Sequence, residues 1–551
     1  MKTIIDSRNR SQSILFIVLC LTLLNIRFAA AQNTEILEAK HLVEVDQTKK
    51  AIEVLTKAIQ TYPAVPSLHY YLGMAQLGSG TRDVALKTFE KGISVDDKEP
   101  LNYVGRGRLS MLENNAQKAK LDFDKALSLS KSKNVAVLQG VADAYMIDPK
   151  RSNDAMNLLN KAKAIDDHDA ETLILLGDAF LQQNNGGQAV TNYERAASLN
   201  TKLAKPHYKI GLVYLRSRNY PAAQEAFNKA IALDPGYTLA YKEIGENYYS
   251  QKEATKAVAA YEKYMGLTEN PEPAKLRMAF FYFMAKDYPK ANTMFENLVT
   301  KPDASITAKR FYAQSLFESG NYEKSRTMFD EYFAKAKPED IAASDYAVYG
   351  KLLQKIGIDS LAVVAFQKSI DLDPKQQEVL QLQSEAYFKL KKYQEAIGAY
   401  EKLRAVKTKW SSPDLYTVGR AYYFQSQTEQ LKTDTAAQRQ LLLRADSAFQ
   451  KLTELQPNMT ISYSWAARTK ASLDPESEKG LAKPFYEKLI EKALLTPDKN
   501  RNDLIEAYSY LGYYHFLKRE KVPARTNWEK VLALDPNSEA AKTALDELKK
   551  M

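Results

Sequence analysis

Side chains that could bind a metal or transfer a proton are few and widely spaced in this chain. Its five histidines stand at positions 41, 69, 168, 207 and 515, and none belongs to a His-Glu-x-x-His pattern, which would place two ligands on one helix face. The run Asp166-Asp167-His168-Asp169 combines carboxylates with an imidazole, but it falls between two predicted helices and is more typical of a solvated loop. We therefore predict no metal site and no cofactor.

Residues for covalent catalysis or phosphate binding lack the patterns that those reactions need. Cys20 is the single cysteine, and no serine stands in a Gly-x-Ser-x-Gly turn. Gly105-Arg106-Gly107 lies within a predicted helix, whereas a glycine-rich phosphate loop follows a strand. The sequence predicts a protein that is not an enzyme. A catalytic site formed among helices is the alternative.

The first 31 residues have the pattern of an export signal. Lys2, Arg8 and Arg10 precede an apolar run of 11 residues at 14–24, and Ala29-Ala30-Ala31 supplies the small residues that a signal peptidase requires. That run is too short to cross a bilayer, which takes about 20 residues. We predict cleavage before Gln32, a mature chain with neither cysteine nor transmembrane segment, and a periplasmic or secreted location.

The formal net charge of +10 is spread along the chain. Lys2, Arg8, Arg10 and Arg27 outweigh Asp6 by three charges in the signal, which leaves +7 on the mature chain with both signs interleaved. A nucleic-acid-binding protein clusters its basic residues on one face. We therefore expect no nucleic acid as a partner, and the mild surplus favours acidic partners or an anionic membrane surface.

Small and aromatic residues recur at a fixed spacing of 34 positions. Two consecutive stretches share the pattern, with Ile210-Gly211, Tyr214, Ala223 and Phe227 in one and Ile244-Gly245, Tyr248, Ala257 and Tyr261 in the next. Apolar residues three and four apart lie on one helical stripe, so each stretch predicts two helices packed together. The small residues allow a close approach beside the rings, and Pro235 ends the second helix near Asp234. The predicted class is all-α.

This pattern resembles the tetratricopeptide repeat (TPR) family, whose unit is 34 residues long. The resemblance implies a right-handed superhelical solenoid of helix-turn-helix repeats, with about 14 units over residues 32–551. We expect N-terminal units at 32–169, central units at 170–410, longer and degenerate units at 411–536, and a capping helix at 537–551. The unit near Ser412 carries extra residues at about 425–438.

In the family that this chain resembles, the first helix of each unit lines a concave groove. The groove positions stand six and three residues before the small residue and one and four after it, which places them on one stripe of the helix. Applied here, that register selects Lys205, Tyr208, Lys242, Tyr249, Leu276, Phe280, Phe283, Arg310, Gln314 and Phe317. These side chains form an aromatic and basic partner-binding surface, or, alternatively, they pack against adjoining helices.

The function that these observations favour is an exported scaffold. It would bind a protein or an extended peptide in its groove and support the assembly of a cell-envelope complex. The alternative is an envelope glycan-binding protein whose aromatic rings stack on sugars. Against that alternative, the chain has three tryptophans, Trp410, Trp465 and Trp528, and the last is a predicted core residue.

Overall fold

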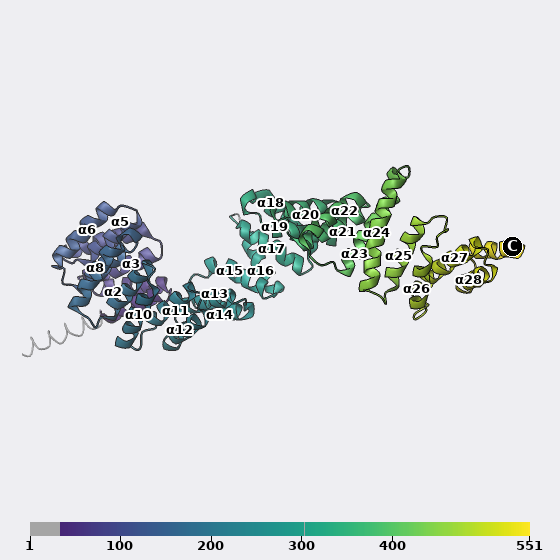
Figure 1. Ribbon diagram of the computed structural model, residues 1–551. Coiled ribbons are helices and arrows are strands. Elements are labelled where there is room, and N and C mark those ends of the chain that lie inside the picture. The colour runs from purple at the N-terminus through teal and green to yellow at the C-terminus, as the bar shows by residue number, and fades with distance from the viewer. Residues whose placement is uncertain (1–32, 302) are drawn as a thin grey trace, which may run out of the picture. The chain divides into compact units, whose positions relative to one another are not determined.

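The computed structural model describes residues 33–301 and 303–551, which fold into helices without a strand in that part of the chain (Figure 1). The predicted all-α repeat solenoid is therefore confirmed. The predicted signal at 1–31, including Cys20, lies outside the described residues. Within the described part, no helix is both long enough and apolar enough to span a membrane.

The chain divides into two compact units, the first ending at Thr300 and the second beginning at Lys301. In the first unit, residues 33–44 are helical and precede α2 (Thr48–Thr61), α3 (Pro66–Gly78), α4 (Arg82–Val95), α5 (Leu101–Leu112), α6 (Ala116–Leu129), α7 (Val135–Tyr145), η1 (Pro149–Arg151), α8 (Ser152–Ile165), α9 (Ala170–Gln182), α10 (Gly186–Leu199), α11 (Lys205–Arg216), α12 (Tyr220–Leu233), α13 (Thr238–Ser250), α14 (Ala254–Leu267), η2 (Glu272–Ala274), α15 (Lys275–Met284) and α16 (Tyr288–Val299).

The second unit continues the same alternation of first and second helices. It contains α17 (Ile306–Glu318), α18 (Tyr322–Lys335), η3 (Pro338–Asp340), α19 (Ala343–Lys355), α20 (Asp359–Leu372), α21 (Gln377–Lys389), α22 (Tyr393–Val406), α23 (Ser412–Ser426), η4 (Glu429–Leu431), α24 (Thr435–Leu455), α25 (Thr460–Leu473), α26 (Lys483–Ala493), α27 (Arg501–Leu517), α28 (Lys521–Leu534) and α29 (Glu539–Lys550).

The helices pair into consecutive hairpins. Residues 33–44 pack with α2, and the pairs α3–α4 through α27–α28 follow, which makes 14 hairpins among the described residues. The odd-numbered helices α3 to α27 and the segment 33–44 are the first helices of the hairpins. We call the side of a unit that these helices form its first-helix face.

Except in the first hairpin and in α7–α8, whose second helices have no aromatic residue, a small residue of the first helix makes a close contact with a ring of the second. A Cβ added to Gly211 would stand 2.5 Å from Cδ1 of Phe227, a ring that is fully buried. Gly177 faces Tyr193, and Gly419 faces Phe449, in the same way. The prediction that the small residues let the two helices approach closely beside the rings is therefore confirmed.

The ends of the helices also follow local residue chemistry. Arg218 turns the chain with a positive φ of 60°, and the Asn219 side chain then accepts a hydrogen bond from the Ala222 amide at the start of α12. Asp234 is the residue after α12, directly before Pro235. The helix thus ends where the sequence predicted.

The two exceptions to a uniform repeat lie where the sequence indicated. The additional residues near 425–438 form η4 and lengthen α24 to 21 residues. At the C-terminal end, α29 is capped by Ser538 and buries Ala541 and Leu548, so a mostly polar helix covers the last hairpin.

The small-residue contact predicts opposite effects for two glycine substitutions in the second unit. Gly419→Ala places a methyl group 2.7 Å from Phe449 Cε1, so we expect overpacking to lower the free energy of unfolding by about 1–3 kcal/mol. Gly398, exposed in the middle of α22, has no atom within 4 Å of an added Cβ. Gly398→Ala should therefore raise stability by roughly 0.5–1 kcal/mol. Urea unfolding followed by circular dichroism compares the two, and equal effects would contradict this explanation.

Candidate functional site

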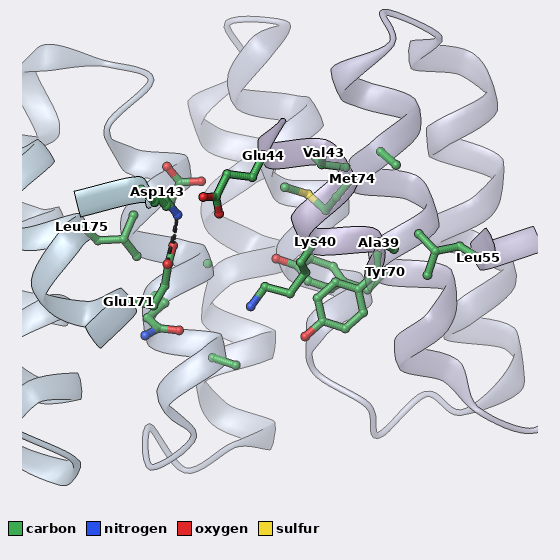
Figure 2. A pocket seen from close by; sticks show the side chains of 16 residues that line it. Ala39, Lys40, Val43, Glu44, Leu55, Tyr70, Met74, Asp143, Glu171 and Leu175 are labelled. Carbon is green, nitrogen blue, oxygen red and sulfur yellow. Dashed lines mark hydrogen bonds and ion pairs between the residues drawn. The ribbon is translucent and has the colours of Figure 1, made fainter. Parts of the chain in front are cut away.

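The first-helix face of the first unit surrounds a cavity of about 340 Å³ (Figure 2). Its walls come from the first helices α3, α7, α9 and α11, together with the segment 33–44. Tyr70, Met74 and Leu175 supply apolar surface, while Lys40 and Glu44 reach in from the N-terminal segment. The cavity thus lies between the beginning of the chain and repeats well over a hundred residues later.

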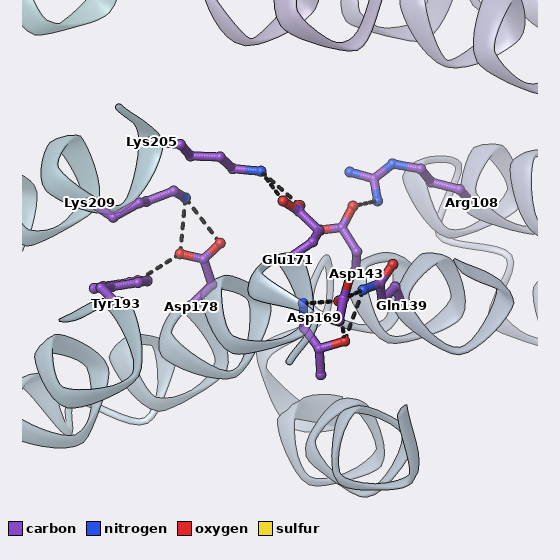
Figure 3. A network of polar contacts seen from close by, with 10 residues as sticks. Arg108, Gln139, Asp143, Asp169, Glu171, Asp178, Tyr193, Lys205 and Lys209 are labelled. Atoms are coloured by element: carbon purple, nitrogen blue, oxygen red, sulfur yellow. Dashed lines mark hydrogen bonds and ion pairs between the residues drawn. The ribbon is translucent and has the colours of Figure 1, made fainter. Parts of the chain in front are cut away.

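Ion pairs between neighbouring first helices line this face (Figure 3). The Lys205 ammonium lies 2.7 Å from the Glu171 carboxylate, Lys209 pairs with Asp178 at 2.9 Å, and Arg108 pairs with Asp143. Because each pair joins helices of different hairpins, the charges link successive repeats. The predicted groove residue Lys205 therefore faces the cavity and already has a carboxylate partner.

Two half-buried carboxyl groups of this cavity have pKa values shifted in opposite directions. Burial raises the pKa of Glu44 above its ordinary 4.5, and Lys205 opposes this only in part. Burial also acts on Glu171, but the charge and hydrogen bond of Lys205 outweigh it and hold the pKa of Glu171 below 4.5. Lys205 therefore stabilises the ionised form of Glu171 more than that of Glu44.

The N-terminal segment contacts residues between 159 and 222 positions further along the chain. Val45 is buried with Ala204, Tyr237 and Ala240, and the Thr268 hydroxyl donates to the Asp46 carboxylate at 3.0 Å. These contacts close the first unit on itself.

A carboxylate from this distant region also caps α2. Gln47 makes no side-chain capping bond at the start of that helix. Glu269 accepts instead from the backbone amides of Lys49 at 2.8 Å and Lys50 at 3.2 Å. Free amides at a helix N-terminus favour a negative charge, so Glu269 stabilises α2 and its docking together.

The other predicted groove residues of the first unit form an aromatic cluster and scattered half-buried positions. Tyr249 lies 5.7 Å from the rings of both Phe280 and Phe281, and Phe280 lies 6.4 Å from Phe283. Tyr208 packs 5.2 Å from Tyr237, next to the docked Val45. Lys242 and Leu276 are half-buried on the same helices as this cluster.

The predicted residues of the second unit divide between a polar network and a pocket. Arg310 Nε lies 2.7 Å and Gln314 Nε2 lies 3.0 Å from one oxygen of Asp345, a carboxylate without solvent exposure that also accepts from Tyr332. Phe317 lines a pocket of about 430 Å³ on the first-helix face, together with Lys351, Gln354, Lys355, Glu378, Leu382 and Lys389. The structure therefore brings Arg310 and Gln314 together but places Phe317 in a separate depression. Partner binding by these ten residues stays a prediction.

Sequence reasoning missed the docking of the N-terminal segment, the Glu269 cap and the buried Asp345. Asp345 stands at the third position of α19 and accepts from the Ala342 amide, so the start of a helix marks it as a local cap. No local pattern marks Val45 or Glu269. Their contacts depend on the path of the repeats between them.

The acidic run at 166–169 lies in the turn between α8 and α9. Asp166, Asp167 and His168 are exposed and close enough to share an ion, while Asp169 caps α9 by accepting from the Thr172 amide. Gly105 and Gly107 lie inside α5, as predicted, with no phosphate loop at that position. Neither feature forms a built site.

Comparison with known proteins agrees with this architecture. Profiles described as tetratricopeptide repeat and TPR repeat match residues 208–270 and 177–217. The structure of the C-terminal part of a TPR repeat-containing protein from Cytophaga hutchinsonii is similar, with 32% identity over 49% of this chain and 99% of that chain and a TM-score of 0.40. This chain belongs to the TPR family.

More distant matches cover shorter parts of the chain. The DnaJ homolog subfamily C member 7 homolog of Dictyostelium discoideum is 24% identical over 192 residues, which cover 32% of this chain and 36% of that relative's length. YrrB, described as a TPR protein with an unusual peptide-binding site, is 21% identical over 34% of this chain and 96% of its own, with a TM-score of 0.22.

The raised pKa of Glu44 predicts how the docking of the N-terminal segment depends on pH. The groups that face Glu44 are Lys205, Glu171, His41 and Tyr237. The pKa of Glu44 is higher in the folded state than in the unfolded state. Protonated Glu44 therefore contributes its full stabilisation when the pH is below the pKa of the unfolded state. That contribution is lost as the pH rises through the pKa of the folded state. Glu44→Gln, which removes the half-buried charge, should melt at a higher temperature than the wild type at pH 7.

The difference between these two melting temperatures should shrink as the pH falls toward 4.5, the ordinary pKa of a glutamate. Differential scanning calorimetry across this range measures both proteins. Glu225→Gln, on the exposed side of α12, is the matched control and should follow the wild type. A difference that stays constant with pH would contradict the assignment to Glu44.

Proposed function

We propose that this TPR protein is an exported scaffold that holds protein segments on its first-helix faces and supports the assembly of a cell-envelope complex. The repeat fold supports protein binding, because stacked hairpins present a long surface to a partner. Export rests on the signal pattern of residues 1–31.

The observation that carries this proposal is the docked N-terminal segment. In the first unit, residues 39–46 occupy the region beside Lys205, Tyr208 and Tyr237. Val45 is 2% exposed there, and Asp46 accepts from Thr268. The chain's own segment supports a partner in which an aliphatic side chain, as at Val45, is flanked by carboxylates.

The side chains of the site suit holding a partner better than catalysis. Several charged groups of the first-helix face in the first unit, among them Arg108, Lys205 and Lys209, are engaged in ion pairs with carboxylates of neighbouring hairpins. Burial raises the pKa values of Tyr70, Tyr208 and Tyr237 above the ordinary value of a tyrosine, which disfavours their use as bases. We propose on this ground that the protein is not an enzyme.

The glycan alternative receives little support from the tryptophans. Trp465 is 7% exposed and Trp528 is 8% exposed, and Trp410 is stacked on Tyr400. Stacking on a sugar ring needs an accessible aromatic face, so these residues offer little surface for it. We therefore propose a protein segment as the partner.

Binding in trans tests the proposed recognition. In the variant Val45→Asp, the chain's own segment would carry a charge into an apolar site, which disfavours its docking. A fluorescent peptide with the sequence of residues 36–50 should therefore bind this variant. In the wild type the tethered segment competes at an effective concentration of about millimolar, so we expect at least roughly tenfold weaker peptide binding. Fluorescence polarisation measures both affinities.

The matched control is Val522→Asp, at a valine that is 76% exposed, and it should behave as the wild type does. A peptide that carries the same Val45→Asp change should not bind any of the three proteins. If the unchanged peptide binds the Val45→Asp protein no more tightly than it binds the wild-type protein, the docked segment is not a model of the partner.

Export has its own test. Cells expressing the full chain should contain a product that begins at Gln32, and mass spectrometry of the fractionated protein identifies that terminus. Deletion of residues 2–31 should leave the product in the cytoplasm. A protein that keeps its first residues and stays with the cytoplasmic fraction would show that the signal prediction is wrong.

A further inference from the structure

Four arginines on the first-helix faces follow one rule, because each pairs with a carboxylate of a neighbouring hairpin. In the second unit, Arg310 pairs with Asp345 at 2.7 Å, and Arg468 binds Glu506 through two nitrogens at 2.8 Å and 2.6 Å. In the first unit, Arg108 pairs with Asp143 and Arg277 with Glu246. These pairs neutralise the guanidinium groups and join consecutive repeats.

Arg420, on α23, departs from this rule. No carboxylate of residues 33–301 or 303–551 forms an ion pair with it, and its one hydrogen bond to a described residue runs from Nη1 to the Tyr416 hydroxyl at 3.3 Å. Its guanidinium carbon lies among aromatic rings instead, at 4.6 Å from the Phe388 centroid, 5.0 Å from Tyr416, 5.4 Å from Trp465 and 5.9 Å from Phe424. Ring faces attract a cation but do not neutralise it.

The repeat register explains why Arg420 has no partner. In the second unit, a basic residue one position after the small residue pairs with a carboxylate six positions before the small residue of the next hairpin. Lys351 pairs with Glu378 at 2.7 Å in this way, and Arg468 pairs with Glu506. The residue at that position for Arg420 is Ile461, the second residue of α25.

Two N–H donors beside this position also lack acceptors. Arg420 Nε and Trp465 Nε1 are buried and make no hydrogen bond to the described residues. A buried donor without an acceptor is unfavourable. A ligand oxygen that reaches the half-buried guanidinium would supply the missing acceptor, and the surrounding rings would strengthen the charge-assisted bond by excluding water.

We propose that Arg420, with the rings of Phe388, Tyr416 and Trp465, binds a carboxylate side chain of an acidic peptide segment. The proposal rests on the proposed function and names the ligand chemistry of the second unit. A single guanidinium matches one carboxylate, and the half-buried rings of Phe388 and Tyr416 fit the apolar stem of a glutamate and its apolar neighbours. The pocket that α19 and α21 line contains three lysines, Lys351, Lys355 and Lys389, against one carboxylate, Glu378. An acidic segment therefore meets a surplus of positive charge there, although Lys389 also lies 3.8 Å from Asp359.

Selection of peptides tests this site on the whole mature protein. A phage library of random 12-residue peptides is selected against the wild type, Arg420→Gln and Arg404→Gln. Arg404 is the matched control, on the second helix α22 with a side chain that is 69% exposed. We expect the wild type and Arg404→Gln to enrich peptides with glutamate or aspartate next to apolar residues, and Arg420→Gln to lose that preference.

A selected peptide and its Glu→Gln counterpart then measure the contact by calorimetry. The wild type should prefer the glutamate peptide by about tenfold, as for a charge-assisted hydrogen bond, and Arg420→Gln should bind both peptides equally. Arg420→Lys, which keeps the charge but not the planar fork, should fall between them. Circular dichroism verifies that each variant is folded. If Arg420→Gln does not fold, Arg420→Lys is compared with the wild type in its place.

The outcomes separate this proposal from the proposed function. If peptides are enriched but the acidic preference is the same in Arg420→Gln, the Arg420 site is wrong while protein binding stands. If no peptide is enriched against the wild type, both proposals are contradicted. Arg420-dependent binding of polygalacturonate without any acidic peptide would assign the site to an acidic glycan and overturn the peptide assignment.

Discussion

The structure depends on one repeated contact, that of a small residue in the first helix with an aromatic ring in the second. Where Gly211 meets Phe227 and Gly419 meets Phe449, a side chain on the glycine would overlap the ring. The contact brings the two helices of a hairpin close together and fixes their relative rotation. The opposite stripe of every first helix is then left to face the neighbouring hairpins and the partner.

That remaining stripe carries the polar chemistry of the protein. Charges on consecutive first helices meet across the hairpin boundary, as Lys205 meets Glu171 and Arg468 meets Glu506. A single substitution in the register changes the result, because Ile461 stands where a carboxylate would pair with Arg420. The same repeat geometry thus produces neutral links at several boundaries and leaves Arg420 without a carboxylate partner among the described residues.

The candidate site was predictable to the extent that it follows the repeat register. The register placed Lys205, Tyr208 and Phe317 on first helices, and each of them borders a cavity, a docked segment or a pocket. It could not show that Arg310 and Gln314 share the buried Asp345, because the capping role of Asp345 belongs to another hairpin. The partner of a side chain depends on the next repeat as much as on its own.

The sequence by itself determined the helical hairpins, their number and their ends, because these depend on residues within about 34 positions of one another. Only the tertiary structure decided that Val45 and Asp46 dock near Tyr237 and Thr268, and that Glu269 caps a helix that begins more than 200 residues earlier. Small rotations between successive hairpins add up along the first unit. The sum of these rotations brings the N-terminal segment to those distant residues. No local sequence pattern encodes that sum.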